Sequence, residues 1–396
     1  MFMRFMMAPA YGDLSDSSGR KPIILVGMTV YAFLLVGYGL AYDFVSLLLM
    51  RALQGMASAA VWPVGEALIV DTSSKEYTGR NLGYYIMSMQ AGMASGPFLG
   101  AIVYALFNEI FFLSPFLSYR LTFISQGVMG ILATAIVALL VKDPKDLEKA
   151  KFSVFDEFKA VTKLMMAKTV ESPKYLLRTF NQKTSYRTLS LYVIYIVAII
   201  NGFGNAMIFP IMTLFLSDFF FLDATIVALI IGIVGVLALS GNPLGGYLSD
   251  LFGRKHVTWI SGLFRGIFYL LLGIEWGLLS VIILFIATRF MWSIFQPSFR
   301  ALQSDMIPEA VRGKEFGIVQ ALFNLGSIIG PLLGGIIYDA FFNVHFSFLG
   351  INLFGVGAAF AIAGIFSIFG SIFLLIYTQP VELSKDQTIE TLAFYD

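Results

Sequence analysis

Two stretches of the sequence share one pattern: Gly12-Asp13-Leu14-Ser15-Asp16-Ser17-Ser18-Gly19-Arg20-Lys21 and Gly246-Tyr247-Leu248-Ser249-Asp250-Leu251-Phe252-Gly253-Arg254-Lys255. They lie 234 positions apart, since Gly12 becomes Gly246. The same offset relates further pairs of identical residues: Pro63 and Pro297, Asp71 and Asp305, Gly79 and Gly313, Gly83 and Gly317, Gly96-Pro97 and Gly330-Pro331, and Gly100 and Gly334. One ungapped offset across so many positions predicts that the chain consists of two homologous halves.

The composition indicates a membrane protein. Hydrophobic residues make up 58% of the 396 residues, against ~45–50% in a soluble domain, and charged residues make up 13%, against ~25%. This argues against a soluble enzyme, a nucleic-acid binder and a disordered scaffold. The net charge of +1 gives no reason to expect a nucleic-acid partner, and the lack of cysteine with only two histidines argues against a metal site or a disulfide framework.

Ten stretches are long and apolar enough to cross a hydrocarbon layer of ~30 Å, which takes about 20 helical residues. Seven contain no charged residue and three contain one to three: 22–42, 81–106, 121–141, 188–217, 224–249, 316–338 and 346–381, then 43–70, 256–274 and 278–304. Between them lies one long polar segment, 143–187, which we expect to be an amphipathic linker. We therefore expect membrane units at 1–142 and 188–381, and a tail at 382–396.

Lysine and arginine collect in every second loop between these stretches. By the positive-inside rule, the basic loops face the cytoplasm. We therefore expect a multi-pass protein of the plasma membrane, with these cytoplasmic segments: 12–21, 71–80, 143–187, 250–256, 305–315 and the C-terminus.

The repeated pattern Gly-x-x-x-Asp-x-x-Gly-Arg-Lys resembles the loop signature of the major facilitator superfamily. Arg51-Ala52-Leu53-Gln54-Gly55 is similar to that family's R-x-x-Q-G motif. A pattern that the family associates with antiporters is present twice, as Gly92, Gly96, Pro97, Gly100 and as Gly326, Gly330, Pro331, Gly334. The resemblance implies an all-α polytopic fold of two pseudo-symmetric six-helix halves. Against that fold we expect helix 1 and most of helix 2 to be missing, because the second half begins near Thr188 and the offset of 234 carries this position to before Met1.

The resemblance assigns the repeated pattern to gating. Asp16 would meet the positive end of the helix that starts near Gly313, and Asp250 would face the helix that starts near Gly79. Two arginines in the pattern would pair with the aspartates at 71 and 305. The candidate gating residues are Gly12, Asp16, Gly19, Arg20, Lys21, Asp71, Gly246, Asp250, Gly253, Arg254, Lys255 and Asp305. The alternative is that these are ordinary loop charges that set the topology. The glycine motifs would let neighbouring backbones pack closely.

Polar and charged side chains inside apolar stretches are costly, and so they are candidate sites. In 43–70 and in 278–304 they recur every three or four residues, which places them on one helix face. The coupling candidates are Arg51, Gln54, Gly55 and Glu66. The substrate candidates are Asn201, Asn205, Arg289, Trp292, Gln296, Arg300, Gln320 and Asn324. The alternative for each amide is a hydrogen bond between helices. We expect Arg300 to lie opposite Glu66.

These observations favour a secondary active transporter that moves a small molecule by alternating access and exports it in exchange for protons. No sequence matches a nucleotide-binding loop, so ATP is not the expected energy source. Two alternatives stay open: an organic-anion uptake or exchange carrier, because arginines outnumber acids on the polar faces, and a truncated relative that does not transport. We expect no enzyme activity, no cofactor and a monomer.

Overall fold

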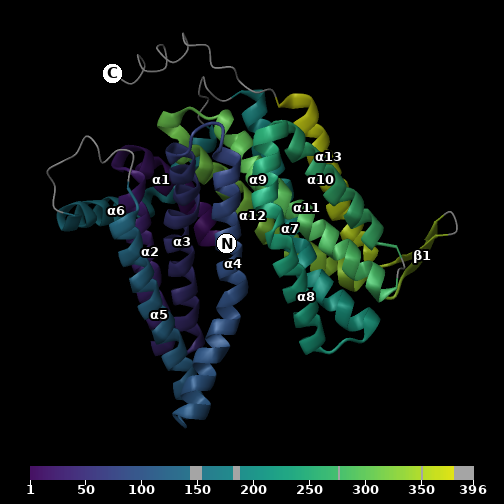
Figure 1. Ribbon diagram of the computed structural model, residues 1–396, viewed down its shortest axis with the longest axis horizontal. Coiled ribbons are helices and arrows are strands. Elements are labelled where there is room, and N and C mark those ends of the chain that lie inside the picture. The colour runs from purple at the N-terminus through teal and green to yellow at the C-terminus, as the bar shows by residue number, and fades with distance from the viewer. Residues whose placement is uncertain (143–153, 182–187, 275–276, 349–350, 379–396) are drawn as a thin grey trace.

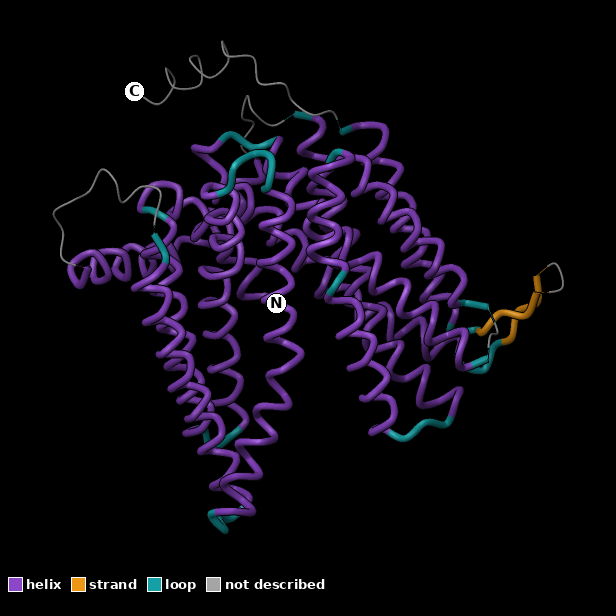
Figure 2. Tube along the Cα trace, in the orientation of Figure 1, coloured by secondary structure: helices purple, strands orange, loops and turns teal. Residues whose placement is uncertain are grey.

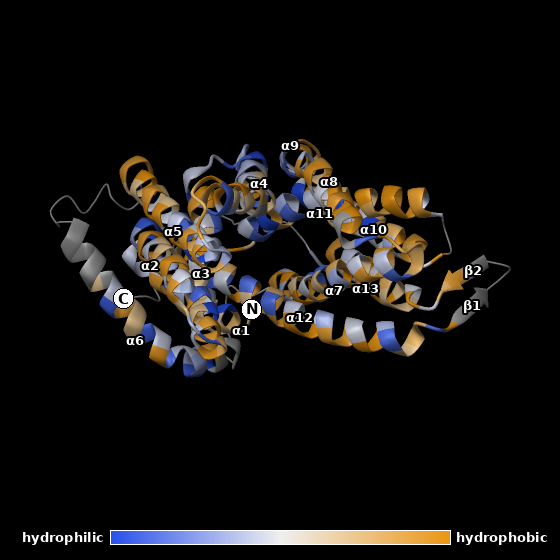
Figure 3. Ribbon diagram, turned by 90° about the horizontal axis from the view of Figure 1, so that it is seen from below, coloured by the Kyte–Doolittle hydropathy of each residue, from blue (hydrophilic) through white to orange (hydrophobic). Residues whose placement is uncertain are grey.

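The computed structural model describes residues 1–142, 154–181, 188–274, 277–348 and 351–378, and these are almost entirely helical (Figure 2). Figure 1 shows two helical bundles that meet near one end and spread apart toward the other. Nine helical segments of the described residues are long and apolar enough to cross a membrane. Viewed from the spread end, hydrophobic residues dominate the outer helices of both bundles (Figure 3). The predicted all-α polytopic fold is therefore confirmed.

The first bundle comprises the helices before the linker, with these bounds: α1 (Phe2–Ser18), α2 (Arg20–Leu40), α3 (Phe44–Thr72), α4 (Thr78–Ala105), the π-helical turn η1 (Leu106–Ile110) and α5 (Pro115–Leu140). The second bundle comprises α7 (Leu189–Phe220), α8 (Ala224–Leu239), α9 (Gly241–Phe252), α10 (Arg254–Leu272), α11 (Leu278–Asp305), the 3-10 turn η3 (Glu309–Val311), α12 (Arg312–Phe341) and α13 (Gly357–Tyr377). The tenth expected stretch, 256–274, forms α10, which lies outside the nine apolar segments and packs on α11 and α13.

Local sequence explains the breaks between several of these helices. Gly19 separates α1 from α2, and Gly253 separates α9 from α10, with φ angles of 92° and 91° that favour glycine over any residue with a Cβ. Asp43 caps α3 by accepting a hydrogen bond from the backbone N–H of Ser46 at 2.8 Å. The two halves thus repeat the same turn at the same place in the repeated pattern.

The sequence suggested that the apolar stretch 346–381 forms one helix, but the structure divides it. Its first part lies in an antiparallel hairpin of β1 (His345–Phe348) and β2 (Ile351–Phe354), and only α13 is long enough to span a membrane. Gly355 then turns the chain into α13 so tightly that an added Cβ would lie 2.1 Å from the carbonyl oxygens of Phe341 and Val344. Hydropathy alone cannot separate a hairpin from the start of a helix when both are apolar.

The linker contains α6 (Val154–Asn181), which lies against the first bundle (Figure 1). The hydroxyls of Tyr11 and Thr169 are hydrogen-bonded at 2.6 Å, and Lys168 forms an ion pair with Asp13 at 3.3 Å. The other linker residues, 143–153 and 182–187, and the expected tail 382–396 lie outside the described residues.

The two bundles touch through one edge, which we call the contact edge and define by Gly12, Gly79, Gly246 and Gly313. Here α1 packs on α12 and α4 packs on α9. An added Cβ at Gly12 would lie 2.0 Å from the carbonyl oxygen of Gly313, and one at Gly246 would lie 2.2 Å from that of Gly79. The offset of 234 relates these two contacts, so the interface has the same pseudo-symmetry as the sequence.

Candidate functional site

A cavity of about 1820 Å³ lies between the two bundles. Its wall is formed by α1, α2, α3 and α4 of the first half and by α7, α8, α11 and α12 of the second. Most of the predicted coupling and substrate residues line it: Arg51, Gln54, Gly55, Glu66, Asn201, Asn205, Arg289, Trp292, Gln296, Arg300 and Gln320. Asn324 is fully buried behind this wall and accepts a hydrogen bond from Gln320 at 3.4 Å.

An ion pair between Glu66 on α3 and Arg300 on α11 joins the two halves at this cavity, with Nε and Oε2 3.1 Å apart. Glu66 is 6% exposed and is the sole acidic residue among the described residues of the lining. Arg300 also donates hydrogen bonds to Gln303 and Gln320, each at 3.1 Å. The arrangement places Arg300 opposite Glu66, as expected from the sequence.

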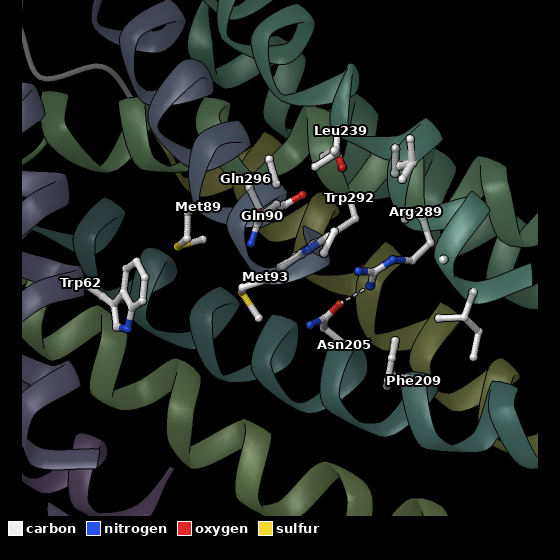
Figure 4. A pocket seen from close by; sticks show the side chains of 18 of the residues that line it. Trp62, Met89, Gln90, Met93, Asn205, Phe209, Leu239, Arg289, Trp292 and Gln296 are labelled. Atoms are coloured by element: carbon white, nitrogen blue, oxygen red, sulfur yellow. Dashed lines mark hydrogen bonds between the residues drawn. The ribbon is translucent and has the colours of Figure 1, made fainter. Parts of the chain in front are cut away.

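A second basic group lies on the same helix, α11. The Arg289 guanidinium donates a hydrogen bond from Nη1 to the side-chain oxygen of Asn205 on α7 at 3.0 Å, beside Trp292 and Phe209 (Figure 4). Behind this wall lies Arg265 of α10, which is 4% exposed and donates to Ser367 at 2.9 and 3.1 Å and to Asn201.

The first half contributes its own polar cluster. Arg51 donates to Gln54 at 2.8 Å, and the Gln54 amide donates to the hydroxyl of Tyr31 at 2.8 Å. Arg4 on α1 donates to Ser58 at 2.8 Å and also lines the cavity. Sequence reasoning missed Arg4, because a single arginine near residue 1 has no periodic neighbours that would mark a face.

Gln90 on α4 is a further cavity residue that sequence reasoning missed. Its amide donates to Gln296 on α11 at 2.6 Å, and its oxygen accepts from Asn242 on α9 at 3.1 Å. Figure 4 shows Gln90 and Gln296 meeting across the cavity wall. The offset of 234 relates Gln90 to Asn324, so applying the repeat to every polar residue in the apolar stretches would have found it.

The candidate gating residues meet at the contact edge. The Asp16 carboxylate accepts hydrogen bonds from the backbone N–H groups of Gly313 and Lys314, each at 2.7 Å. Asp250 accepts from those of Gly79 and Arg80 at 3.0 and 2.8 Å. A carboxylate therefore meets the positive end of a helix from the other half twice, where the resemblance placed it.

Arginines complete both clusters. Arg20 pairs with Asp16 at 2.6 Å and with Asp71 at 3.0 Å. Arg254 pairs with Asp305 and lies 3.7 Å from Asp250. Two further links between the halves were not expected from the sequence: Arg312 pairs with Asp71, and Arg254 donates to the backbone oxygen of Lys75 at 2.5 Å. Lys21 and Lys255 follow at the starts of α2 and α10.

The two glycine motifs differ from the expectation that both pack closely. On α12, an added Cβ at Gly326 would lie 2.2 Å from a backbone oxygen of α7, and one at Gly330 would lie 2.3 Å from another. Gly334 is similarly close to the Met207 side chain, at 2.6 Å. On α4, Gly92 and Gly96 have no such neighbour within 4 Å among the described residues, and Gly100 has only the Gln126 side chain, at 3.3 Å. Among the described residues, the motif glycines of α12 are therefore closely packed against α7, and those of α4 have no comparable backbone neighbour.

The sequence matches the Major Facilitator Superfamily over residues 1–188 and 194–392. The chain therefore belongs to the major facilitator superfamily, and it is a multi-pass membrane transporter, not an enzyme. The family and the transporter class had been predicted from the sequence, and both predictions are confirmed.

Two relatives with a described role resemble the chain over most of its length. The chain is 24% identical over 370 residues to the quinolone resistance protein NorA of Staphylococcus aureus, covering 89% of this chain and 82% of the relative. It is 25% identical over 345 residues to the multi-drug resistance efflux pump PmrA of Streptococcus pneumoniae, covering 85% and 76%.

Two solved structures share the fold. The human organic anion transporter MFSD10 (TETRAN) has a TM-score of 0.71 at 18% identity, covering 94% of this chain and 81% of that chain. The proton:xylose symporter XylE, bound to 6-bromo-6-deoxy-D-glucose, has a TM-score of 0.71 at 15% identity, covering 98% and 86%.

Proposed function

We propose that the protein exports small organic molecules across the plasma membrane in exchange for protons, by alternating access. The observation that carries the coupling is the ion pair between Glu66 and Arg300, which joins the halves at the cavity. Glu66 is the sole acid among the described lining residues. Export is supported by the names of the relatives, a resistance protein and an efflux pump.

The ion pair gives protons a way to change the equilibrium between two conformations. With Glu66 ionised, the pair holds α3 against α11, and the contact edge stays closed. Protonation of Glu66 removes the charge and releases Arg300. Breaking a buried pair costs ~3–5 kcal/mol, which is comparable to the few kcal/mol that separate the conformations of such proteins. A proton that enters a cavity open to the outside would thus favour opening of the contact edge to the cytoplasm.

The coupling is tested in proteoliposomes with an imposed proton gradient, using ethidium and fluorescein as transported probes. We expect Glu66→Gln to abolish uphill transport driven by the gradient while retaining exchange of probe across the membrane without one. The control is Glu309→Gln, which removes an exposed carboxylate on η3 outside the cavity lining. Uphill transport by Glu66→Gln at the wild-type rate would overturn proton coupling through this residue.

The orientation needs a separate test, because the contact edge faces the cytoplasm in this proposal. Ser74 lies between α3 and α4 and Ser114 lies between η1 and α5, so the two exposed serines are at opposite ends of α4, and the chain has no native cysteine. In intact cells, a membrane-impermeant maleimide should label Ser114→Cys and should label Ser74→Cys only after the membrane is opened. The reverse pattern would place the contact edge outside and reverse the direction of transport.

A further inference from the structure

The cavity lining carries more positive than negative charge. Among its described residues are the arginines at 4, 51, 289 and 300 and the single carboxylate of Glu66. Because Glu66 pairs with Arg300, three guanidinium groups remain, and each is given only a neutral hydrogen-bond acceptor: Ser58, Gln54 and Asn205. An anion in the cavity would compensate this charge.

Arg289 is half-buried and has unused hydrogen-bond donors. A guanidinium has five N–H donors, and the structure gives Arg289 one hydrogen bond, to Asn205 at 3.0 Å. Within the described part of the chain, the ion pairs include neither Arg289 nor Arg265. A half-buried charge within the membrane without an opposite charge is unfavourable, so this wall would gain from an anionic ligand.

Arg265 adds to the positive field without reaching the cavity lining. It is 4% exposed, and its guanidinium carbon lies 4.8 Å from the centre of the Trp292 ring and 5.0 Å from that of Phe295. Its hydrogen-bond acceptors are neutral, a serine hydroxyl and an asparagine amide. Two arginine charges therefore lie on the same side of the cavity.

Aromatic rings line the same cavity as Arg289. Trp292 is stacked with Phe295 at 5.8 Å and with Phe323 at 6.4 Å, and all three rings line the cavity. Phe209 lies beside Asn205 (Figure 4). Flat apolar surface next to a planar guanidinium favours a ligand with an aryl group and a carboxylate, since a carboxylate can accept two parallel hydrogen bonds from one arginine.

We propose that the transported substrate is an aromatic organic anion whose carboxylate binds Arg289 beside Asn205 and whose ring packs on Trp292. The inference rests on the proposed function only in that it takes this cavity as the transport site. It names the chemical class of the substrate, and it is independent of how transport is driven.

The test is binding to the purified protein in detergent, measured by isothermal titration calorimetry without any ion gradient. Three probes share one ring system and differ in charge: 2-naphthoate, 2-naphthylmethanol and 2-naphthylmethylammonium. We expect 2-naphthoate to bind tighter than the neutral alcohol by about tenfold or more, as a charge-assisted hydrogen bond predicts. The ammonium probe should bind no tighter than the alcohol. Tighter binding of the alcohol or the ammonium probe, or no binding of 2-naphthoate at millimolar concentration, would overturn the proposal.

Variants locate the preference at Arg289. Arg289→Gln should remove the preference for 2-naphthoate while changing the affinity for the alcohol less than about twofold, because the ring surface is retained. Asn205→Asp is a second variant that supplies Arg289 with a carboxylate of its own, and it should weaken 2-naphthoate binding without removing a charge from the wall. The control is Arg120→Gln, which removes an arginine of α5 outside the cavity lining.

The outcomes separate this inference from proton coupling. If 2-naphthoate keeps its preference in both Arg289→Gln and Asn205→Asp, the anion site is not at Arg289. If the preference behaves as expected and the proteoliposomes show no proton-driven transport, the substrate class stands and the coupling fails.

Discussion

Helices α4 and α12 carry the same glycine pattern, yet these glycines lie in opposite surroundings. An added Cβ at Gly330 would lie 2.3 Å from the carbonyl oxygen of Phe203 on α7, whereas one at Gly96 would meet nothing within 4 Å among the described residues. The offset of 234 relates α12 to α4. A sequence repeat therefore copies the face of a helix without specifying what covers that face.

Placing the same bulky side chain on each helix tests whether the two glycine patterns differ in this way. Gly330→Val should strongly destabilise the protein, since overpacking costs about 1–3 kcal/mol and occasionally more, and the clash here is with backbone. Gly96→Val should have little effect, because its side chain meets open space. The measurement is thermal unfolding in detergent, with size-exclusion chromatography to check folding. An equally large loss for Gly96→Val would mean that the α4 face is covered in the folded protein.

The two aspartates of the contact edge allow a second comparison between the halves, and the expected change in transport is smaller. Asp16 and Asp250 each accept two backbone hydrogen bonds, but Asp16 lies 2.6 Å from Arg20 whereas Asp250 lies 3.7 Å from Arg254. Both Asp16→Asn and Asp250→Asn should impair transport, since a carboxylate at a helix end contributes roughly 0.3–2 kcal/mol. The loss should be larger for Asp16→Asn.

Initial transport rates at matched membrane expression provide this measurement. Asp339→Asn is the control, because Asp339 is exposed near the far end of α12 and makes no contact at the contact edge. A larger loss for Asp250→Asn would mean that the shorter ion pair does not decide which aspartate contributes more to transport.

The sequence predicted the contacts that the repeat makes twice. Asp16 and Asp250 accept hydrogen bonds from the helix starts that the family resemblance implied, and the offset of 234 carried that expectation from one half to the other. The facing polar stripes of α3 and α11 were likewise visible as residues three or four apart. For such elements, the helical spacing shows which residues share a face, and the repeat shows which residues correspond in the two halves.

Contacts that lack a symmetric copy could not be predicted in this way. The offset relates Arg312 to Thr78, so the ion pair of Arg312 with Asp71 has no counterpart in the other half. The bridge from Gln90 to Gln296 depends on how the bundles dock, which no periodicity within one half records. The hairpin before α13 was missed because it is as apolar as the helix that follows.

Gln90 provides a third test, because it links the halves while its counterpart Asn324 lies inside the second half. Gln90→Leu should increase opening of the contact edge about fivefold, since a hydrogen bond is worth ~1 kcal/mol. The readout is the labelling rate of Ser249→Cys, a position that is 1% exposed at the contact edge. Asn324→Leu should leave that rate nearer to wild type. Equal rates in the two variants would show that the bridge does not hold the halves together.

The smallest predicted change is in the free energy of unfolding, and it has opposite signs on α4 and α12. At Gly92 the space is open, so Gly92→Ala should stabilise the protein slightly, by about 0.5 kcal/mol, because alanine is the better helix former. At Gly326 an added Cβ would lie 2.2 Å from the carbonyl oxygen of Ile199, so Gly326→Ala should destabilise instead. One methyl group at symmetry-related positions thus isolates the effect of a covering helix from that of the sequence pattern. The free energy of unfolding, measured by titration with a denaturing detergent, gives both signs, and a destabilised Gly92→Ala variant would show that α4 is covered as α12 is.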